Sequence, residues 1–267
     1  MDETTQSPKP ICISVITVCF NDLNQLRHTI DSVREQVKAD YEHIVIDGGS
    51  KDGTLQYLAD LPGGDEFSWY SESDDGIFDA MNKGAMQSKG HVLVFINAGD
   101  TFTSTDDLAY VQTSFEQNKW DWAYGAVRYV NNERLAIDGI VQAPFQKRRL
   151  ELGLRFVPHQ AMYMTARLFK ELNGFDLDFP LDSDQDMAMR AAALSKPHVM
   201  IRFLCDFLVG GAHENASRLE REMSYHRMRR KNGLLLGSSV LVDRTYSAMT
   251  AGQRNLRDVI RRTIRIR

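Results

Sequence analysis

The sequence predicts a layered α/β fold in which helices cover both faces of a mainly parallel, mixed sheet. Apolar runs alternate with segments whose apolar residues recur at helical spacing, and such strand-then-helix units favour parallel strands joined by crossovers. The short apolar run Val92–Ile96 is typical of a strand that is covered on both faces. We therefore place this run at the centre of the sheet.

Strand-then-helix units also precede Val92. Ile13–Cys19 and Tyr41–Ile46 are apolar strands, and each is followed by leucine or isoleucine at helical spacing. Phe67–Tyr70 predicts a third strand, and a helix follows over about Ile77–Ser88. The later part of the chain predicts, in order, a strand at Asp121–Tyr129, a hairpin turn at Asn131–Glu133, an apolar stretch at Ala161–Met164, a helix at Ala166–Leu172, a helix that begins near Asp182, and two strands at Val199–Phe203 and Phe207–Gly210.

Composition is that of an ordinary globular enzyme. A chain of 267 residues, 43% hydrophobic and 25% charged, can bury one large core and carry a C-terminal extension. The net charge of -4 gives no overall attraction to nucleic acid. Cys12, Cys19 and Cys205 lack metal-ligand spacing, so we interpret them as reduced core residues of a cytoplasmic protein. Residues 1–10 are polar and predict a disordered lead-in, and no segment has the roughly 20 apolar residues that cross a bilayer.

The glycine-rich turn after the second strand does not match either of two common nucleotide-binding motifs. Gly48–Gly53 does not follow the G-x-G-x-x-G pattern, and nothing matches the phosphate loop, which disfavours a dehydrogenase or an ATPase. Asp47 emerges at the carboxyl end of its strand, as Asp100 does after the Val92–Ile96 strand and Asn97-Ala98-Gly99. Both carboxylates would lie at the carboxyl edge of the sheet, where a nucleobase or a ribose can donate hydrogen bonds to them.

Four segments together resemble the successive motifs of family 2 glycosyltransferases. They are Ile13–Asn21, Ile46–Thr54, Gly76–Gly84 and Phe95–Asp100, and the resemblance spans roughly residues 11–211. It implies the GT-A fold, in a version similar to colanic-acid and capsule-type bacterial members. It also implies inverting transfer of a sugar from a nucleotide-diphosphate donor, assisted by Mg²⁺ or Mn²⁺.

The same resemblance implies a donor site. By carry-over, Val18, Asp47, Asp74 and Asn97 line the nucleotide-sugar site and Asp100 binds the cation. Many relatives have Asp-x-Asp-Asp where this chain has Asn97-Ala98-Gly99-Asp100, which leaves one carboxylate. One carboxylate suffices for Mg²⁺ when phosphate oxygens and water complete the shell, and a metal-independent variant is the alternative. His213 is a candidate metal ligand, with a loop histidine without function as the other interpretation.

A second acidic cluster predicts the catalytic base. Asp182, Asp184 and Asp186 open a helix, and helix capping explains one or two of them but does not require all three. The family has Glu-Asp-x-Asp here, and its first Asp, the general base, corresponds to Asp184. Ser183 replaces the family's Glu. We interpret His159 as a structural hydrogen-bonding residue with at most a minor role in acceptor binding.

We expect residues 11–213 to form the catalytic domain, with residues 11–100 as its nucleotide-binding half and 101–213 as its acceptor half. Residues 214–267 would form a basic helical extension. Aliphatic residues interleave with arginines over 252–267, which favours either a helix on an anionic membrane surface or a solvated tail or oligomer contact. The expected location is cytoplasmic, with peripheral attachment to the inner face of the membrane under the first interpretation.

The expected function is transfer from a UDP-sugar to a hydroxyl of a glycan or lipid-linked glycan during surface polysaccharide synthesis. A sugar-nucleotide nucleotidyltransferase would share the layered fold, but it needs a basic glycine-rich loop after the first strand, and Phe20–Leu23 contains none. A catalytically silent nucleotide-sugar-binding protein is the third interpretation. It would tolerate the loss of Asp184.

Overall fold

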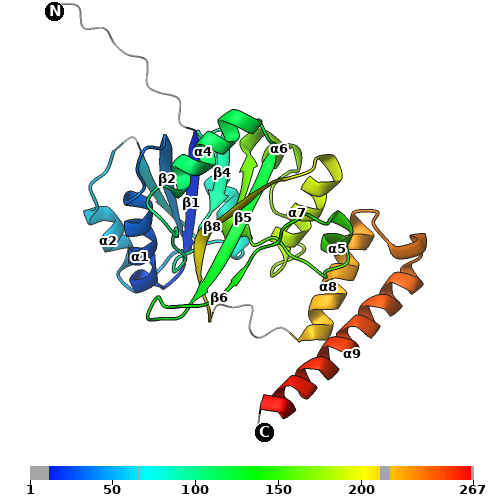
Figure 1. Ribbon diagram of the computed structural model, residues 1–267. Coiled ribbons are helices and arrows are strands. Elements are labelled where there is room, and N and C mark those ends of the chain that lie inside the picture. The colour runs from blue at the N-terminus through cyan, green and yellow to red at the C-terminus, as the bar shows by residue number, and fades with distance from the viewer. Residues whose placement is uncertain (1–11, 65, 211–216, 266–267) are drawn as a thin grey trace, which may run out of the picture. The chain divides into compact units, whose positions relative to one another are not determined.

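A computed structural model describes residues 12–64, 66–210 and 217–265 (Figure 1). Its sheet has eight strands in the order β3-β2-β1-β4-β7-β5-β6, and β8 also pairs with β5. The strands are β1 Ile13–Cys19, β2 Tyr41–Asp47, β3 Phe67–Ser71, β4 Val92–Phe95, β5 Trp122–Val130, β6 Ala136–Ile140, β7 Met162–Thr165 and β8 His198–Leu208.

The sheet is mixed in the way that the sequence predicts. β1 is parallel to β2 and β4, and β2 is parallel to β3, whereas β7 runs antiparallel between β4 and β5. β4 occupies the middle of the strand order, and all four of its residues are buried. Because Cys19 pairs with Asp47 at the ends of β1 and β2, the polar residues that follow these strands emerge at one edge.

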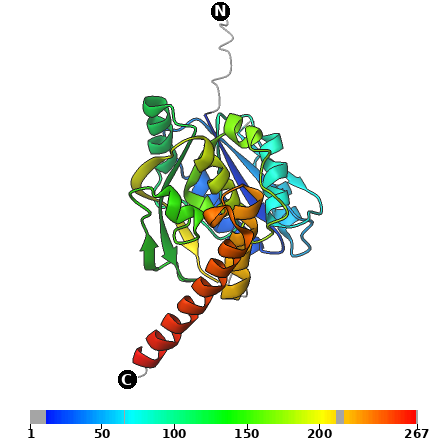
Figure 2. The same ribbon diagram turned by 90° about the vertical axis from the view of Figure 1, so that its right-hand side faces the viewer.

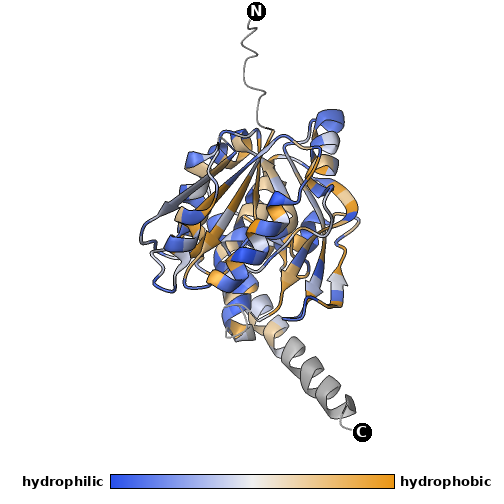
Figure 3. Ribbon diagram, turned by 90° about the vertical axis from the view of Figure 1, so that its left-hand side faces the viewer, coloured by the Kyte–Doolittle hydropathy of each residue, from blue (hydrophilic) through white to orange (hydrophobic). Residues whose placement is uncertain are grey.

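Helices cover both faces of this sheet. In chain order they are α1 Leu23–Arg34, α2 Thr54–Asp60, α3 Ile77–Gln87, α4 Asp107–Asn118, α6 Ala166–Glu171 and α7 Ser183–Leu194. Successive residues of a strand point to opposite faces. Val15 belongs to the same core cluster as Val33 of α1, whereas Ile16 lies against Gly84 of α3. α1 and α3 therefore lie on opposite faces, and Figure 3 shows the hydrophobic strands between more hydrophilic helices.

One strand prediction was wrong. The sequence predicted two strands at 199–203 and 207–210, but β8 is continuous from His198 to Leu208. The charged Asp206 lies within this strand, where both of its carboxylate oxygens accept hydrogen bonds from Arg128 on β5 (2.7 and 2.5 Å). The expected placement of the cysteines in the core is confirmed, since Cys12, Cys19 and Cys205 are buried.

The described residues form two compact units. The first extends to Phe145 and includes Val157–Val209, and the second comprises Gln146–Phe156 with the described residues that follow Val209. The second unit contains α5 Lys147–Glu151, α8 Arg218–Lys231, a short 3₁₀ turn at Leu236–Ser238, and α9 Val240–Arg265, which Figure 2 shows as one unbroken helix. The predicted C-terminal helical extension is thus confirmed. No helix in the described part of the chain is long and apolar enough to cross a membrane.

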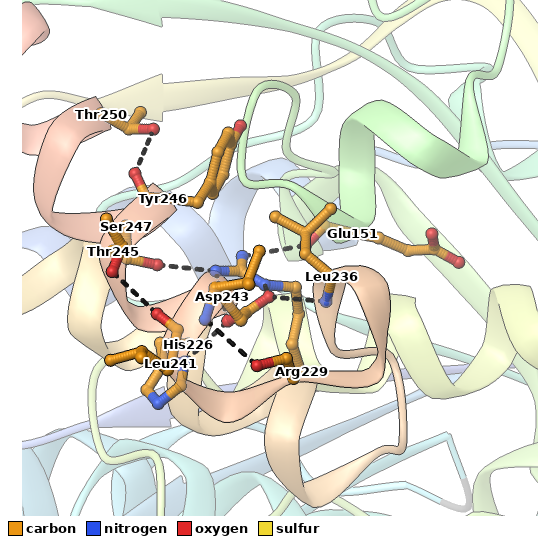
Figure 4. A network of polar contacts seen from close by, with 12 residues as sticks. Glu151, His226, Arg229, Leu236, Leu241, Asp243, Thr245, Tyr246, Ser247 and Thr250 are labelled. Carbon is orange, nitrogen blue, oxygen red and sulfur yellow. Dashed lines mark hydrogen bonds and ion pairs between the residues drawn. The ribbon is translucent and has the colours of Figure 1, made fainter.

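The second unit is organised around buried charges (Figure 4). Arg229 and Asp243 are both fully buried, and the Arg229 guanidinium donates to both Asp243 oxygens (2.8 and 3.0 Å). Arg229 also donates to Ser247 Oγ (2.7 Å), and His226 Nδ1 lies 2.6 Å from Asp243 Oδ2. A charge is buried at acceptable cost only when it is paired and hydrogen-bonded. The many charged residues of α8 are therefore not all on a solvated face.

Candidate active site

Asp47 ends β2 at the carboxyl edge of the sheet, and its side chain is fixed by its own turn. Asp47 Oδ2 accepts hydrogen bonds from the N–H groups of Gly49 (3.1 Å) and Ser50 (3.0 Å) and from Ser71 Oγ (2.6 Å). Asp47 Oδ1 is buried and has no hydrogen-bond partner among the described residues. Buried polar atoms are almost always paired, so this oxygen is suited to accept a hydrogen bond from a ligand.

Asp74 and Val18 lie beside the same turn. Asp74 Oδ1 accepts from the Gly76 N–H (2.9 Å), and Asp74 Oδ2 lies 2.6 Å from where a Cβ on Gly48 would stand. Any larger residue at position 48 would displace this carboxylate. The Val18 carbonyl accepts from the Ala98 N–H (3.0 Å), which ties the end of β1 to the Asn97–Asp100 turn. The structure thus brings Val18, Asp47, Asp74 and Asn97 to one edge.

The Asn97–Asp100 turn follows β4 and is held from two sides. Gly99 has φ +101°, a conformation that favours glycine. Thr29 of α1 accepts from the Gly99 N–H (2.9 Å) and donates to the Asp100 carbonyl (2.8 Å). Arg134, from the β5–β6 hairpin, donates to the Gly99 carbonyl and to Gln25 Oε1. These contacts fix the turn rigidly at the end of the central strand.

Asp100 carries its carboxylate in a buried position. Its Oδ1 accepts from the Leu208 N–H at the end of β8 (3.0 Å), and the Gln160 side chain lies near enough to lower the pKa of the carboxyl. Burial raises the pKa of Asp100 to about 6, although the Leu208 bond and the nearby His159 and Arg134 act in the opposite direction. A negative charge here is costly near neutral pH. A cation beside Asp100 would remove much of that cost.

Asp184 lies in the first turn of α7, and its side chain is 13% exposed. Its Oδ1 accepts from the Gln185 N–H (2.8 Å), and its Oδ2 lies 3.1 Å from Gln185 Nε2 and 3.2 Å from His159 Nδ1. Gln185 in turn exchanges two hydrogen bonds with the backbone of Val157 (3.1 and 3.0 Å). The start of α7 is therefore attached to the segment that precedes β7.

His159 and Gln160 join the two acidic clusters. His159 contacts Asp184 through Nδ1, and its Nε2 lies 3.2 Å from Asn97 Nδ2. The side chain of the next residue, Gln160, lies beside the Asp100 carboxyl and lowers its pKa. Asp100 and Asp184 are far apart in the sequence, yet two consecutive residues of one 3₁₀ turn, His159–Ala161, contact both of them. This is the central observation on the site.

Two other acids of the second cluster have different roles. Asp186 is fully buried and pairs with Arg190 (2.6 Å), which also donates to the carbonyls of Leu172 and Gly174. Asp186 therefore holds the Arg190 side chain in place. Asp182 is the N-cap residue of α7 but makes no side-chain capping bond. Capping thus does not explain this cluster.

Sequence reasoning missed two site residues. It gave His159 only a structural or minor role, although His159 lies between Asn97 and Asp184. The one available signal was the pair of polar residues, His159 and Gln160, directly before an apolar stretch. Arg134 carried no signal, because nothing in the sequence indicates that a hairpin arginine reaches the Gly99 carbonyl.

Two side-chain oxygens of the site could act as ligands of a divalent cation. His213 lies outside the described residues, and in the part of the chain described no group of three or more His, Cys, Asp or Glu could hold a metal. Asn97 Oδ1, however, is buried without a partner among the described residues, close in sequence to the Asp100 carboxylate. One carboxylate and one amide oxygen suit Mg²⁺ or Mn²⁺ when a diphosphate and water supply the other ligands.

Comparison with known proteins points to one family. Residues 14–172 match Glycosyl transferase family 2. The chain is 37% identical over 199 residues to an uncharacterized glycosyltransferase of Mycobacterium tuberculosis, an alignment that covers 73% of this chain and 74% of the relative. It is 30% identical over 196 residues to a PGL/p-HBAD biosynthesis glycosyltransferase of Mycobacterium bovis, covering 72% and 73% of the two chains.

Solved structures agree on the fold. Residues 1–349 of S. aureus TarS, in complex with UDP-GlcNAc, superpose with a TM-score of 0.68 at 16% identity, covering 83% of this chain and 66% of that one. The mannosyltransferase PcManGT from Pyrobaculum calidifontis, in complex with GDP-Man and Mn²⁺, gives a TM-score of 0.61 at 17% identity, covering 91% and 74%. The predicted GT-A fold is confirmed.

Proposed function

Because this chain belongs to glycosyltransferase family 2 and is an enzyme of glycosyl transfer, we propose that it inverts the sugar that it transfers. The donor is a nucleotide-diphosphate sugar, with UDP-sugars preferred, and Asp184 is the general base. The acceptor is a hydroxyl of a glycan or lipid-linked glycan in surface polysaccharide synthesis. The observation that carries the proposal is the His159–Gln160 turn, whose two side chains contact Asp184 and Asp100.

The donor half of the proposal rests on the carboxyl edge of β1, β2 and β4. Asp47 Oδ1 has no partner in the described structure, so it can accept from a nucleobase N–H or a ribose hydroxyl. Asp74 and Val18 lie next to it. The neighbours in complex with UDP-GlcNAc and with GDP-Man share this fold, which supports a nucleotide sugar as donor.

The acceptor half rests on Asp184. A sugar hydroxyl is a poor nucleophile, and a carboxylate within hydrogen-bond reach can take its proton while the new bond to the anomeric carbon forms. The bond to the diphosphate breaks at the same time, and negative charge develops on the leaving group. Asp100 and the Asn97 oxygen would hold Mg²⁺ or Mn²⁺, which stabilises that charge. The base lies opposite the leaving group, so the displacement inverts the anomeric carbon.

Nucleotide binding is the first test. A ligand that binds only the folded state stabilises it by about 2.7 kcal/mol at a hundred times its Kd. We expect UDP with Mg²⁺ or Mn²⁺ to raise the melting temperature, and we expect Asp47→Asn to reduce that rise, because an amide presents one acceptor atom instead of two. AMP serves as the control ligand. If neither UDP nor GDP raised the melting temperature at millimolar concentration, the donor site would be wrong.

The C-terminal part of α9 is proposed as a peripheral membrane attachment. The sequence interleaves arginines with leucine, valine and isoleucine over residues 252–267, a composition that suits an anionic lipid surface. We expect the full chain to float with vesicles that contain phosphatidylglycerol and to stay unbound with neutral phosphatidylcholine vesicles. A truncated chain that ends at residue 251 should not float. Equal flotation of the two chains would contradict the proposal.

A further inference from the structure

We propose that His159 is a positioning residue that holds the Asp184 carboxylate in its productive orientation, and that Asn97 fixes the imidazole tautomer required for this. The inference rests on the proposed role of Asp184 as the base. It assigns a function to a histidine that sequence reasoning treated as structural, and to an asparagine that replaces the family's first metal carboxylate.

The position of the ring supports the inference. His159 is 5% exposed, and each of its nitrogens faces a polar atom at 3.2 Å, with Asp184 Oδ2 on one side and Asn97 Nδ2 on the other. Phe78 packs edge-on against the ring, with 6.4 Å between the ring centres. A buried imidazole held on three sides cannot turn without breaking both polar contacts.

Asn97 determines which nitrogen carries the proton. The Asn97 amide nitrogen can only donate, so His159 Nε2 must accept, and the proton of the neutral ring then lies on Nδ1. That N–H donates to Asp184 Oδ2. A carboxylate at position 97 has no proton to donate to Nε2, so asparagine is the residue that supports this tautomer. The same orientation leaves Asn97 Oδ1 without a protein partner in the described structure.

These contacts leave the Asp184 carboxylate with few positions at which it can accept another hydrogen bond. A carboxylate offers about four acceptor positions. Three of them are used, by the Gln185 N–H, the Gln185 side-chain amide and His159. The fourth remains for a hydroxyl, and the 13% of the side chain that is exposed gives access to it. Without His159, the carboxylate can rotate, and the hydroxyl loses its fixed partner.

Three substitutions of His159 test the contributions of its two ring nitrogens separately. In His159→Asn the side-chain amide lies close to where Nδ1 was, in His159→Gln it lies close to where Nε2 was, and His159→Leu removes both. The assay is release of UDP or GDP from whichever of UDP-glucose, UDP-N-acetylglucosamine and GDP-mannose the wild type hydrolyses fastest. We expect Leu and Gln to lower kcat by roughly 10- to 100-fold, as small misplacements of a catalytic group do. Asn should retain most of the activity, and the loss in Leu and Gln should fall mainly on kcat rather than on KM, because Asp47 and Asp74 of the donor site do not contact His159.

A double variant tests the coupling to Asp184. If His159 acts through Asp184, His159→Leu combined with Asp184→Asn should be no slower than Asp184→Asn alone. Three outcomes would each overturn the inference. The kcat losses of His159→Leu and Asp184→Asn could multiply in the double variant, His159→Asn and His159→Gln could lose kcat equally, or His159→Leu could keep the wild-type kcat. A wild type that hydrolyses no nucleotide sugar would instead overturn the proposed function.

A spectroscopic measurement is independent of turnover. In ¹⁵N-histidine-labelled full-length protein, the long-range ¹H–¹⁵N spectrum should show His159 as the Nδ1–H tautomer. In Asn97→Leu this preference should weaken, while the melting temperature records whether the fold is kept. A wild-type His159 that carries its proton on Nε2 would contradict the assignment of Asn97.

Discussion

Asp184→Asn should lower sugar transfer by roughly 10²- to 10⁴-fold, the typical cost of losing an acid–base catalyst. The amide cannot take a proton from the acceptor hydroxyl, but it keeps the shape of the side chain. Its oxygen can still accept from the Gln185 N–H, which bonds Asp184 Oδ1 (2.8 Å). The affinity for UDP-sugar should therefore change little. Steady-state kinetics and calorimetric titration of the donor would measure both quantities.

Asp186→Asn is the matched control. Asp186 lies two residues further along α7 and pairs with Arg190 (2.6 Å). Its substitution should lower stability and leave the kcat of the folded enzyme within a few-fold of wild type. Near-normal turnover in Asp184→Asn, or a larger loss of kcat in Asp186→Asn, would remove Asp184 from the role of base.

Asp243→Asn should destabilise the C-terminal helical unit by roughly 3–5 kcal/mol, the usual cost of leaving a buried charge without its partner. Arg229 is fully buried, and two of its nitrogens donate to Asp243. Asp243 also accepts from His226 and from the Leu236 N–H (3.0 Å). Hydrogen exchange of the amides in α8, together with urea denaturation of the full chain, would measure the loss.

The pH dependence has a definite sign. Burial tends to raise the pKa of Asp243, but the hydrogen bonds from Arg229 and His226 outweigh it and hold the pKa below its ordinary value of 3.8. The stability that this carboxylate contributes is thus present above that pH and is lost as the pH falls through the lowered value. The difference between wild type and Asp243→Asn should shrink in acid. A double variant, Arg229→Met with Asp243→Leu, should lose less than Asp243→Asn, because no charge is left unpaired.

The local patterns were sufficient to predict the catalytic fold. β4 had to be central because Val92–Phe95 has no polar residue, and no exposed strand could carry such a run. The continuous β8 could not be predicted, because its charged Asp206 looks like a strand end unless Arg128 on the neighbouring strand is known to pair with it. A local sequence pattern cannot reveal a pairing partner that is 78 residues away.

Some residues of the candidate site could likewise be predicted from the sequence, and others could not. Asp47 and Asp100 follow strands whose ends meet at one sheet edge, so strand order alone places them. The link between Asp100 and Asp184 depends on how the His159–Ala161 turn sits beneath α7, and only tertiary packing determines that. The roles of Val18, Asp47, Asp74, Asn97, Asp100 and Asp184 remain predictions for experiment, as does that of His213 outside the described residues.

The stereochemistry of the reaction tests the central claim most directly. A carboxylate that activates the acceptor opposite the departing diphosphate requires a single displacement with inversion. Proton NMR during the first minutes of hydrolysis of an α-linked UDP-sugar should show the β-anomer of the free sugar appearing first, before mutarotation mixes the two forms. First appearance of the α-anomer would mean retention, and would contradict the account in which Asp184 acts as the base of an in-line displacement.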